Sequence, residues 1–362
     1  MMGVTAIRPL AGQAVLRVDL GAIVANWRDL SALHGAQVAG VVKADAYGLG
    51  AGPVARALRD AGCTIFFVAH LIEGLALREA IGPAPGIIVL NGFPPGEDGD
   101  ARLWPVLNQL GDVADHAGAG STAVLHIDTG MARLGLDARE QAILAEDRTR
   151  LAGLDLRFVM THLACADEPG HPMNAIQAAR FALAASRIAP DEPRSFANSS
   201  GIFLGPDFRS ALARPGCALY GINPTPTGKN PMRQVVRVEA EILQLRDIAA
   251  GDTVGYGASW TAPGPRRIAT VAAGYADGYL RALSGRSFGI LHGRVVQLVG
   301  RVSMDLSTFD VTDVPQAAPG DRLLLIGGEA NTPDDIAARA GTIGYEVLTS
   351  LGARYFRCYE GA

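Results

Sequence analysis

The chain has 362 residues, of which 49% are hydrophobic and 19% are charged. This composition is typical of a globular protein that is large enough for two domains, or for one large barrel with an appendage. The 36 acidic and 32 basic residues give a formal net charge of −4. The sequence contains neither a basic run nor an apolar stretch of about 18 residues, so it predicts no nucleic-acid partner and no membrane span.

The four cysteines (Cys63, Cys165, Cys217 and Cys358) are dispersed along the chain and form no CxxC pair. This usage indicates neither a metal site nor a disulfide framework, and it fits a reducing compartment. The first 20 residues lack the apolar core of a secretory signal. We therefore expect a cytoplasmic protein.

Apolar strand-like runs alternate with helical patterns between residues 38 and 221. The predicted strands are Val38–Lys43, Ile65–Ala69, Ile87–Leu90, Leu110–Ala114, Val124–Asp128, Phe158–Thr161, Ser195–Asn198 and Ala218–Gly221. The clearest helical patterns cover Ala51–Ala61, Leu71–Ala80 and Asn174–Arg187. Because parallel strands need crossover connections, this alternation predicts an α/β fold with a parallel sheet, and eight such units predict a closed (β/α)8 barrel. A further strand at Ala14–Val18 precedes the barrel and can pack on either domain.

The pattern changes near Asn223–Arg233, a segment rich in Pro, Gly and Asn. The strands predicted beyond it are Val235–Leu245, Ile268–Ala273, Phe288–Leu291, Val295–Leu298 and Leu323–Ile326. Turn signals separate them, which favours a mainly β, antiparallel domain. One helix is predicted at Pro333–Ala340, with Thr332 as its N-cap. We expect the barrel over residues 12–230 and the C-terminal domain over residues 231–362, with residues 1–11 free to pack on the latter.

Lys43 ends an apolar run and precedes a glycine-containing turn, in the sequence VVKADAYGLG. Burial disfavours the charged form of a lysine, and a desolvated lysine with a lowered pKa can form a Schiff base. An isolated strand-end lysine more often extends its ammonium group to water. Here Arg133, His162, Asn198 and Arg214 also fall near predicted strand ends, which is where a barrel carries its chemistry.

The run ANSSG, residues 197–201, places hydroxyls and backbone N–H groups ahead of a helical pattern. Such an arrangement suits a phosphate, although a simple helix N-cap uses the same residue types. Barrels often bind phosphate after strands seven and eight. A Schiff-base lysine combined with a phosphate site indicates pyridoxal phosphate.

Nine motifs occur in an order that resembles the bacterial pyridoxal phosphate-dependent alanine racemases. They are VVKADAYGLG, DTGMARLG, THLA, ANSSG, RPGCALYG, VGYGASW, AAGYADGY, GRVSMD and GYEVL. The resemblance covers the chain from about Leu16 to its end, and the ordered set is highly specific. It implies an eight-stranded barrel followed by a mainly β domain, and a head-to-tail homodimer with active sites shared between subunits.

The activity implied is that of an isomerase that interconverts L-alanine and D-alanine. The sequence does not assign the D-alanine to peptidoglycan synthesis or to catabolism. The alternative is a racemase of another or broader amino-acid range on the same architecture.

The resemblance also implies a role for each site residue. Lys43 holds the cofactor covalently and is one catalytic base; Tyr256, contributed by the partner subunit, is the other, and His162 is hydrogen-bonded to it. The cofactor phosphate is bound by Tyr47, Ser199 and Tyr345 with the backbone at Gly216 and Cys217, next to Asn198, while Arg214 faces the pyridine nitrogen. Arg133 contacts the cofactor's phenolic oxygen and the substrate carboxylate, and Tyr275, Met304 and Asp305, again from the partner, line the entrance and the substrate pocket.

These roles are chemically coherent, because racemisation removes the α-proton from one face and returns it on the other. Lys43 serves D-alanine and Tyr256 serves L-alanine. The ordinary pKa values of lysine and tyrosine are ~10.4 and ~10, so both groups must be tuned to act at neutral pH. Arg214 is always charged and cannot accept a proton, so it keeps the ring nitrogen unprotonated. The ring is then a weaker electron sink, which we expect to suppress transamination.

One position departs from the family pattern. Many members have a carbamylated lysine, which orients the arginine, two residues before the Asp of DTGM; here that residue is His126. A histidine cannot form a stable carbamate, so we predict that none is present. Chloride, water or His126 itself then remains to orient Arg133.

Overall fold

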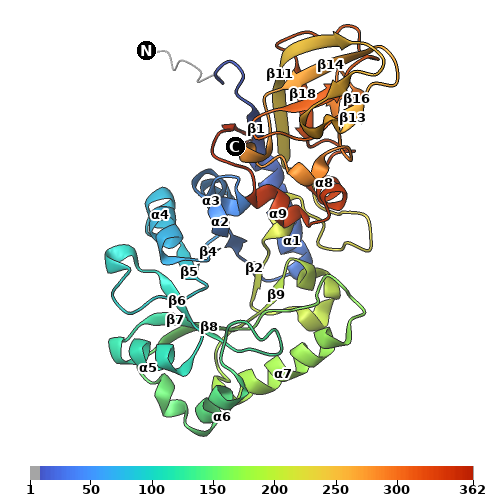
Figure 1. The fold of residues 1–362 in the computed structure, drawn as a ribbon. Coiled ribbons are helices and arrows are strands. Elements are labelled where there is room, and N and C mark those ends of the chain that lie inside the picture. Colours follow the sequence, from blue (N-terminus) through green and yellow to red (C-terminus); the bar gives the residue numbers. More distant parts are fainter. Residues whose placement is uncertain (1–8, 362) are drawn as a thin grey trace, which may run out of the picture. The chain divides into compact units, whose positions relative to one another are not determined.

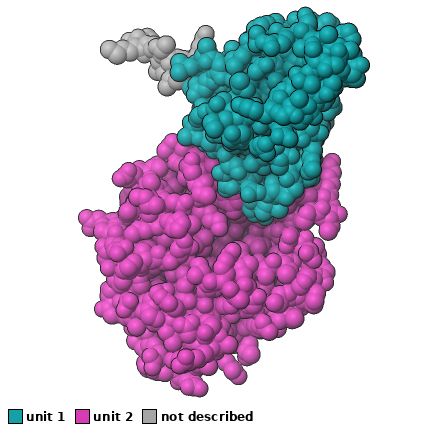
Figure 2. Space-filling view, in the orientation of Figure 1, with its two compact units in different colours: residues 1–20, 234–362 teal, residues 21–233 magenta. Residues whose placement is uncertain are grey.

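The computed structural model describes residues 9–361 and divides the chain into two compact units. One unit is Gly21–Arg233, and the other joins the described residues up to Leu20 with those from Gln234 onwards (Figure 2). The division at its C-terminal side lies close to the expected boundary at residue 230. Residues 1–8, part of the segment expected to pack on the C-terminal domain, lie outside the described residues.

The division differs from the expected one at the N-terminal side, where residues 12–20 group with the C-terminal unit rather than with the barrel. The reason is the pairing of strand β1 (Val15–Asp19). It runs antiparallel to β11 (Val236–Ile248) and parallel to β19 (Phe356–Glu360). The sequence left open which of the two domains this strand packs on. In the structure it pairs with strands of the C-terminal domain.

A parallel sheet forms the centre of the Gly21–Arg233 unit (Figure 1). Its segments are β2 (Gln37–Val38), β3 (Gly40–Val41), β4 (Ile65–Val68), β5 (Gly86–Val89), β6 (Trp104–Leu107), β7 (Thr122–His126), β8 (Asp155–Met160), β9 (Arg194–Asn198) and β10 (Leu212–Arg214). β2 pairs with β10 and β3 pairs with β4, so these two segments are successive halves of one strand. The sheet of this fully described unit therefore closes with eight strands, which confirms the predicted barrel.

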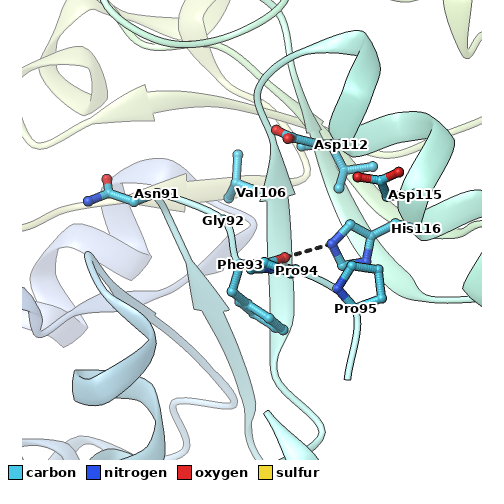
Figure 3. Close-up of a pocket in the computed structure, with 10 residues that line it drawn as sticks. Asn91, Gly92, Phe93, Pro94, Pro95, Val106, Asp112, Asp115 and His116 are labelled. Atoms are coloured by element: carbon cyan, nitrogen blue, oxygen red, sulfur yellow. Dashed lines mark hydrogen bonds between the residues drawn. The ribbon is translucent and has the colours of Figure 1, made fainter. Parts of the chain in front are cut away.

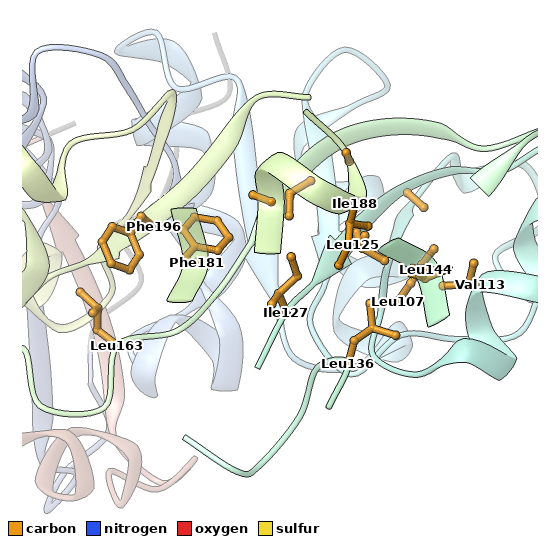
Figure 4. Close-up of a cluster of buried hydrophobic side chains, with 14 of the residues drawn as sticks. Leu107, Val113, Leu125, Ile127, Leu136, Leu144, Leu163, Phe181, Ile188 and Phe196 are labelled. Atoms are coloured by element: carbon orange, nitrogen blue, oxygen red, sulfur yellow. The ribbon is translucent and has the colours of Figure 1, made fainter. Parts of the chain in front are cut away.

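Helices cover the outside of the sheet. They are α1 (Leu20–His34), α3 (Ala51–Asp60), α4 (Leu71–Ile81), α5 (Leu110–Ala119), α6 (Ala138–Glu146) and α7 (Pro172–Ile188). A buried apolar cluster joins α5, α6 and α7 to strands β6–β9 (Figure 4). Within it, the Phe196 ring stacks on those of Phe181 and Phe208 at centroid distances of 5.3 and 5.5 Å. This burial, at about 25 cal/mol per Å² of apolar area, holds the strand ends in place.

Two of the predicted barrel strands are wrong. The segment predicted as the fourth strand is helix α5, whose first turn carries Asp112; the strand itself is β6, and its Pro105 obscures the signal because proline is disfavoured within strands. The segment predicted as the eighth strand forms a 3₁₀ turn at Cys217–Tyr220, and the strand is β10. As a result, Arg214 is the last residue of the eighth strand rather than a residue preceding it.

The second unit is mainly antiparallel. Its strands besides β1, β11 and β19 are β12 (Thr253–Val254), β13 (Trp260–Thr261), β14 (Arg266–Val271), β15 (Phe288–Leu291), β16 (Arg294–Leu298), β17 (Ser307–Asp310) and β18 (Arg322–Ile326). β11 pairs with β18 at one end and with β14 at the other, which closes the ring β11-β18-β15-β16-β17-β14. β12 and β13 form a separate ribbon.

The helix predicted in this unit is confirmed as α8 (Pro333–Ala340), whose N-cap Thr332 accepts a hydrogen bond from the Asp335 N–H. The sequence did not predict the short helix α9 (Gly344–Thr349) that follows it. No helix within residues 9–361 combines the length and apolar character needed to cross a bilayer.

Candidate active site

The first barrel strand leads directly into a left-handed turn, α2 (Lys43–Tyr47), whose last four residues have φ values of 51–57°. This conformation costs L-residues roughly 1–2 kcal/mol each, so it persists only where neighbouring groups hold it. Two carboxylates do so here. Glu73 accepts the Ala44 N–H at 2.7 Å, and Asp45 accepts the Ala51 N–H at 2.7 Å. The sequence predicted a turn after Lys43, but neither its left-handed conformation nor the role of Glu73.

Lys43 is half-buried at the start of this turn. Burial lowers the pKa of its ammonium group, the nearby charge of Arg133 lowers it further, and Glu73 opposes both. A lowered pKa increases the fraction of neutral amine, which is the form that attacks an aldehyde. The local environment thus favours the nucleophilic role predicted for this lysine.

A group of hydroxyl and backbone N–H groups lies where the first and last strands meet, since the Val41 N–H donates to the Pro215 carbonyl at 3.3 Å. The buried Ser199 hydroxyl accepts the N–H of Gly216 at 2.9 Å and that of Ala218 at 3.3 Å. The Tyr47 hydroxyl lies so close to Gly216 that a Cβ there would come within 2.2 Å of it. We call Tyr47, Ser199 and the backbone of Gly216 and Cys217 the hydroxyl cradle. Burial raises the pKa of Tyr47, so its phenol remains a hydrogen-bond donor.

Asn198 has a structural role beside this cradle. Its side-chain oxygen accepts the Gly201 N–H at 2.8 Å, so it closes the 3₁₀ turn Ser200–Leu204. The capping function considered for the ANSSG run therefore belongs to Asn198, whereas Ser199 faces Gly216.

Arg214 is almost fully buried at the end of β10. Its guanidinium donates to the Ser195 hydroxyl and to the carbonyl oxygens of Thr161 and Phe196. Burial lowers the pKa of Arg214 to about 10, so the group is still charged at neutral pH. These contacts fix the plane of a permanent cation at the barrel mouth.

Arg133 and His162 follow β7 and β8, respectively. The carboxylate of Asp128 accepts N–H groups of residues 130–132 and so shapes the loop that leads to Arg133. The Arg133 side chain is exposed and makes no hydrogen bond or ion pair within residues 9–361. Burial lowers the pKa of His162 well below its ordinary range, and the charges of Arg214, Arg133 and Lys43 act in the same direction. His162 is therefore neutral at neutral pH.

The buried histidines His126 and His162 are expected to make the fold less stable in acid. Burial, reinforced by Arg214, lowers the pKa of His126 from 6.5 to about 4. The unfolded chain then binds the proton more readily than the folded one, so the free energy of unfolding falls as the pH decreases from 6.5 towards 4. His126 alone contributes roughly 2 kcal/mol of this loss between pH 7 and pH 5. Urea unfolding at both pH values tests it: the His126→Phe variant should lose less stability than the parent, and an equal loss in both proteins would refute the assignment.

The remaining predicted residues lie in the C-terminal unit. Tyr256 occupies the turn between β12 and β13, and its side chain is 71% exposed. The Tyr275 N–H donates to the Ser303 carbonyl at 3.0 Å, which places Tyr275 beside Met304 and Asp305. Tyr345 lies on α9. The predicted site residues thus form two groups, one at the barrel mouth and one on the loops of the second unit.

A separate pocket of about 260 Å³ lies where β5 and β6 end against α5 (Figure 3). Its polar lining residues are Asn91, Asp112, Asp115 and His116. Both ring nitrogens of His116 are already bonded, to the Phe93 carbonyl at 2.7 Å and to the Ser121 hydroxyl at 2.9 Å. None of the predicted site residues lines this pocket.

A closed barrel with a half-buried lysine after its first strand and a hydroxyl cradle beside its last strand defines the class of barrel enzymes that carry a cofactor on lysine. Models of the alanine racemase N-terminal and C-terminal domains match residues 18–224 and 235–359. The chain belongs to the alanine racemase family.

Individual relatives agree with this assignment over nearly the whole chain. The chain is 55% identical over 350 residues to an alanine racemase of Acidiphilium cryptum, covering 94% of this chain and 97% of that one. It is 48% identical over 363 residues to a protein of Mesorhizobium japonicum described as a catabolic alanine racemase, covering 97% and 94%. Its fold matches the alanine racemase of Bartonella henselae, solved with covalently bound pyridoxal phosphate, with a TM-score of 0.92 at 38% identity, covering 97% of this chain and 100% of that one. The resemblance inferred from the motifs is confirmed.

Proposed function

We propose that the protein racemises alanine with pyridoxal phosphate bound to Lys43. The observation that carries this proposal is that Lys43, whose pKa is lowered, begins the turn whose last residue, Tyr47, contributes its hydroxyl to the cradle. Its relatives are described as alanine racemases, and the Bartonella henselae structure holds the same cofactor covalently.

The residues at the barrel mouth fit this cofactor. Lys43 supplies the amine, and the hydroxyl cradle supplies donors for a phosphate at a point where only glycine fits at position 216. When bound, the cofactor withdraws electrons from the Cα of the amino acid and so acidifies its α-proton. Arg214, fixed by Ser195 and Thr161, presents a charged guanidinium that cannot accept a proton from the ring nitrogen.

Two bases on opposite faces of the substrate then perform the racemisation. The Lys43 amine takes the α-proton of D-alanine, and the side-chain oxygen of Tyr256 takes that of L-alanine. In the L-to-D direction Tyr256 removes the proton and Lys43 delivers one to the other face. In the D-to-L direction the two groups exchange these roles. Arg133 pairs with the substrate carboxylate, for which a guanidinium has matching geometry.

The second base comes from a partner subunit in this proposal. Large side chains of the C-terminal unit are exposed, with Tyr256 at 71%, Ile343 at 60% and Met304 at 54%. Exposed apolar groups of this size favour contact with another protein surface. We place the barrel mouth of a second copy there, so that Tyr256, Tyr275, Met304 and Asp305 complete that copy's site.

Relatives described as catabolic and a structural neighbour described as biosynthetic, from Pseudomonas aeruginosa, both match the chain. We therefore propose the racemisation itself, which serves either the supply of D-alanine for peptidoglycan or its catabolism. The four free thiols fit the cytoplasmic location that we propose.

The activity is tested by adding L-alanine to the purified holoenzyme and detecting D-alanine with a coupled oxidase. Parallel assays with L-serine, L-lysine and L-arginine measure the substrate range. We expect D-alanine to form with the highest kcat/KM of the four products. A higher kcat/KM for another amino acid would assign the protein to the broader-range alternative, and the absence of all four products would refute racemase function.

Replacing Arg214 by glutamate tests the role of the buried cation. A carboxylate facing the ring nitrogen favours its protonation and strengthens the electron sink, so we expect pyruvate, the by-product of transamination with alanine, to increase at least tenfold per turnover. The measurement is lactate dehydrogenase-coupled detection of pyruvate, with Arg214→Lys as a control that keeps the charge. Equal pyruvate formation by both variants would contradict this role.

A further inference from the structure

His126, at the end of β7, has ring nitrogens in two different environments. Nδ1 lies 2.8 Å from the side-chain oxygen of Asn108. The amide nitrogen of Asn108 donates to the carbonyls of Leu90 at 3.1 Å and Val106 at 3.2 Å, so the amide oxygen must be the atom that faces the ring. Because that oxygen can only accept, Nδ1 of His126 carries the hydrogen.

The Nε2 atom of the neutral ring is therefore an acceptor. It has no hydrogen-bond partner within residues 9–361. Burial, followed by the charge of Arg214, lowers the pKa of His126 to about 4; Arg133 acts in the same direction and Asp128 opposes it. The ring is thus an uncharged acceptor in a barrel mouth where Lys43, Arg133 and Arg214 are all donors.

The segment that carries Arg133 is tied to the same histidine. The Leu136 N–H donates to the His126 carbonyl at 2.8 Å. Gly135 lies over the imidazole, since a Cβ at that position would come within 3.0 Å of the ring's Cγ. Arg133 stands two residues before Gly135, and its guanidinium makes no hydrogen bond or ion pair in the described chain, whereas Arg214 is held by Ser195 and Thr161.

We propose that His126 is a positioning residue for Arg133: Nε2 of its Nδ1-protonated tautomer accepts a hydrogen bond from the Arg133 guanidinium and orients that group towards the substrate carboxylate. The reference to the carboxylate rests on the proposed function, but the contact between the two side chains does not. His126, Asn108 and Gly135 thereby perform the orientation without a carbamate or a bound anion.

Nitrogen NMR of the holoenzyme with ¹⁵N-labelled histidine tests the contact without any turnover. We expect the His126 Nε2 resonance to be that of an unprotonated nitrogen, and Nδ1 that of a protonated one. The Arg133→Met variant should move the Nε2 resonance and leave Nδ1 in place. A protonated Nε2, or an Nε2 resonance that chloride shifts and Arg133→Met does not, would overturn the proposal.

Kinetics test the positioning itself. A hydrogen bond to a charged group corresponds to a tenfold or larger change in binding, so His126→Phe should raise the KM for alanine at least about tenfold and change kcat less. His126→Gln can present an acceptor oxygen, so its KM should lie between that of the parent protein and that of His126→Phe. Asn108→Asp should also raise KM, because a carboxylate favours the charged ring and turns Nε2 into a donor.

The matched control is His116→Phe. His116 is also buried, but both of its ring nitrogens are bonded outside the barrel mouth. We expect this variant to lose stability and keep the parental KM. An unchanged KM in His126→Phe, or an equal rise in His116→Phe, would contradict the proposal. If the parent protein did not racemise alanine, the proposed function would fail, while the NMR result would still decide the contact between His126 and Arg133.

Discussion

Replacing Lys43 by alanine is expected to abolish covalent cofactor binding and to lower kcat for alanine racemisation at least ~10⁴-fold. Both the covalent attachment and one of the two proton transfers depend on this amine. Burial first, and then the charge of Arg133, lowers the pKa of Lys43 and so increases the fraction of neutral, nucleophilic amine. Covalent attachment is measured by mass spectrometry of the peptide that contains Lys43 after borohydride reduction.

The matched control for this variant is Lys43→Arg, which keeps the charge and the length but cannot form the Schiff base at neutral pH. Both variants should bind the cofactor reversibly through the hydroxyl cradle, because Tyr47 and Ser199 are unchanged. Retention of covalent cofactor in Lys43→Ala would identify a different attachment site and contradict the account.

Replacing Tyr256 by phenylalanine is expected to lower kcat by ~10²–10⁴-fold in both directions, the range for loss of one general base. The side chain is exposed in the single chain, so the substitution should change the stability of the fold little. The informative measurement is exchange of the α-hydrogen in D₂O. L-alanine should stop exchanging, whereas D-alanine should still exchange through Lys43.

Mixed dimers extend this test to the shared site. Lys43→Ala and Tyr256→Phe subunits are inactive as separate proteins, but a mixed dimer contains one site with both bases intact. We expect mixing, with reversible dissociation, to restore up to about a quarter of the parental activity. No restoration would contradict a site completed by the partner, and exchange of L-alanine by the Tyr256→Phe protein alone would contradict the assignment of the second base.

Much of the fold could be predicted from the sequence because the buried strands are short apolar runs between helical patterns. The two errors share a physical cause: at both positions a local signal was misleading. Pro105 hides β6, since proline argues against a strand. Cys217–Tyr220 is as apolar as a strand, but its residues form a buried 3₁₀ turn. The pairing of β1 with residues more than 200 positions away depends on tertiary contacts that no local pattern contains.

The candidate site was predictable where strand ends carry unusual residue types. Lys43, Arg214 and Ser199 were identified in this way, and the structure brings them to one end of the barrel. Glu73 and Asn108 were missed because each acts through a hydrogen bond to a residue far away in sequence. The left-handed turn after Lys43 was missed because alanine, aspartate and tyrosine rarely adopt that conformation without external support.

In the proposed mechanism, Lys43 and the Tyr256 of a second subunit act as two bases on alanine bound through pyridoxal phosphate. To test this two-base mechanism, the holoenzyme is incubated with L-alanine in D₂O. The first D-alanine formed is then analysed by mass spectrometry. Because one base removes the proton and the other delivers a solvent-derived deuteron, we expect D-alanine with deuterium at Cα. Initial D-alanine that keeps its original hydrogen, or no D-alanine at all, would contradict it.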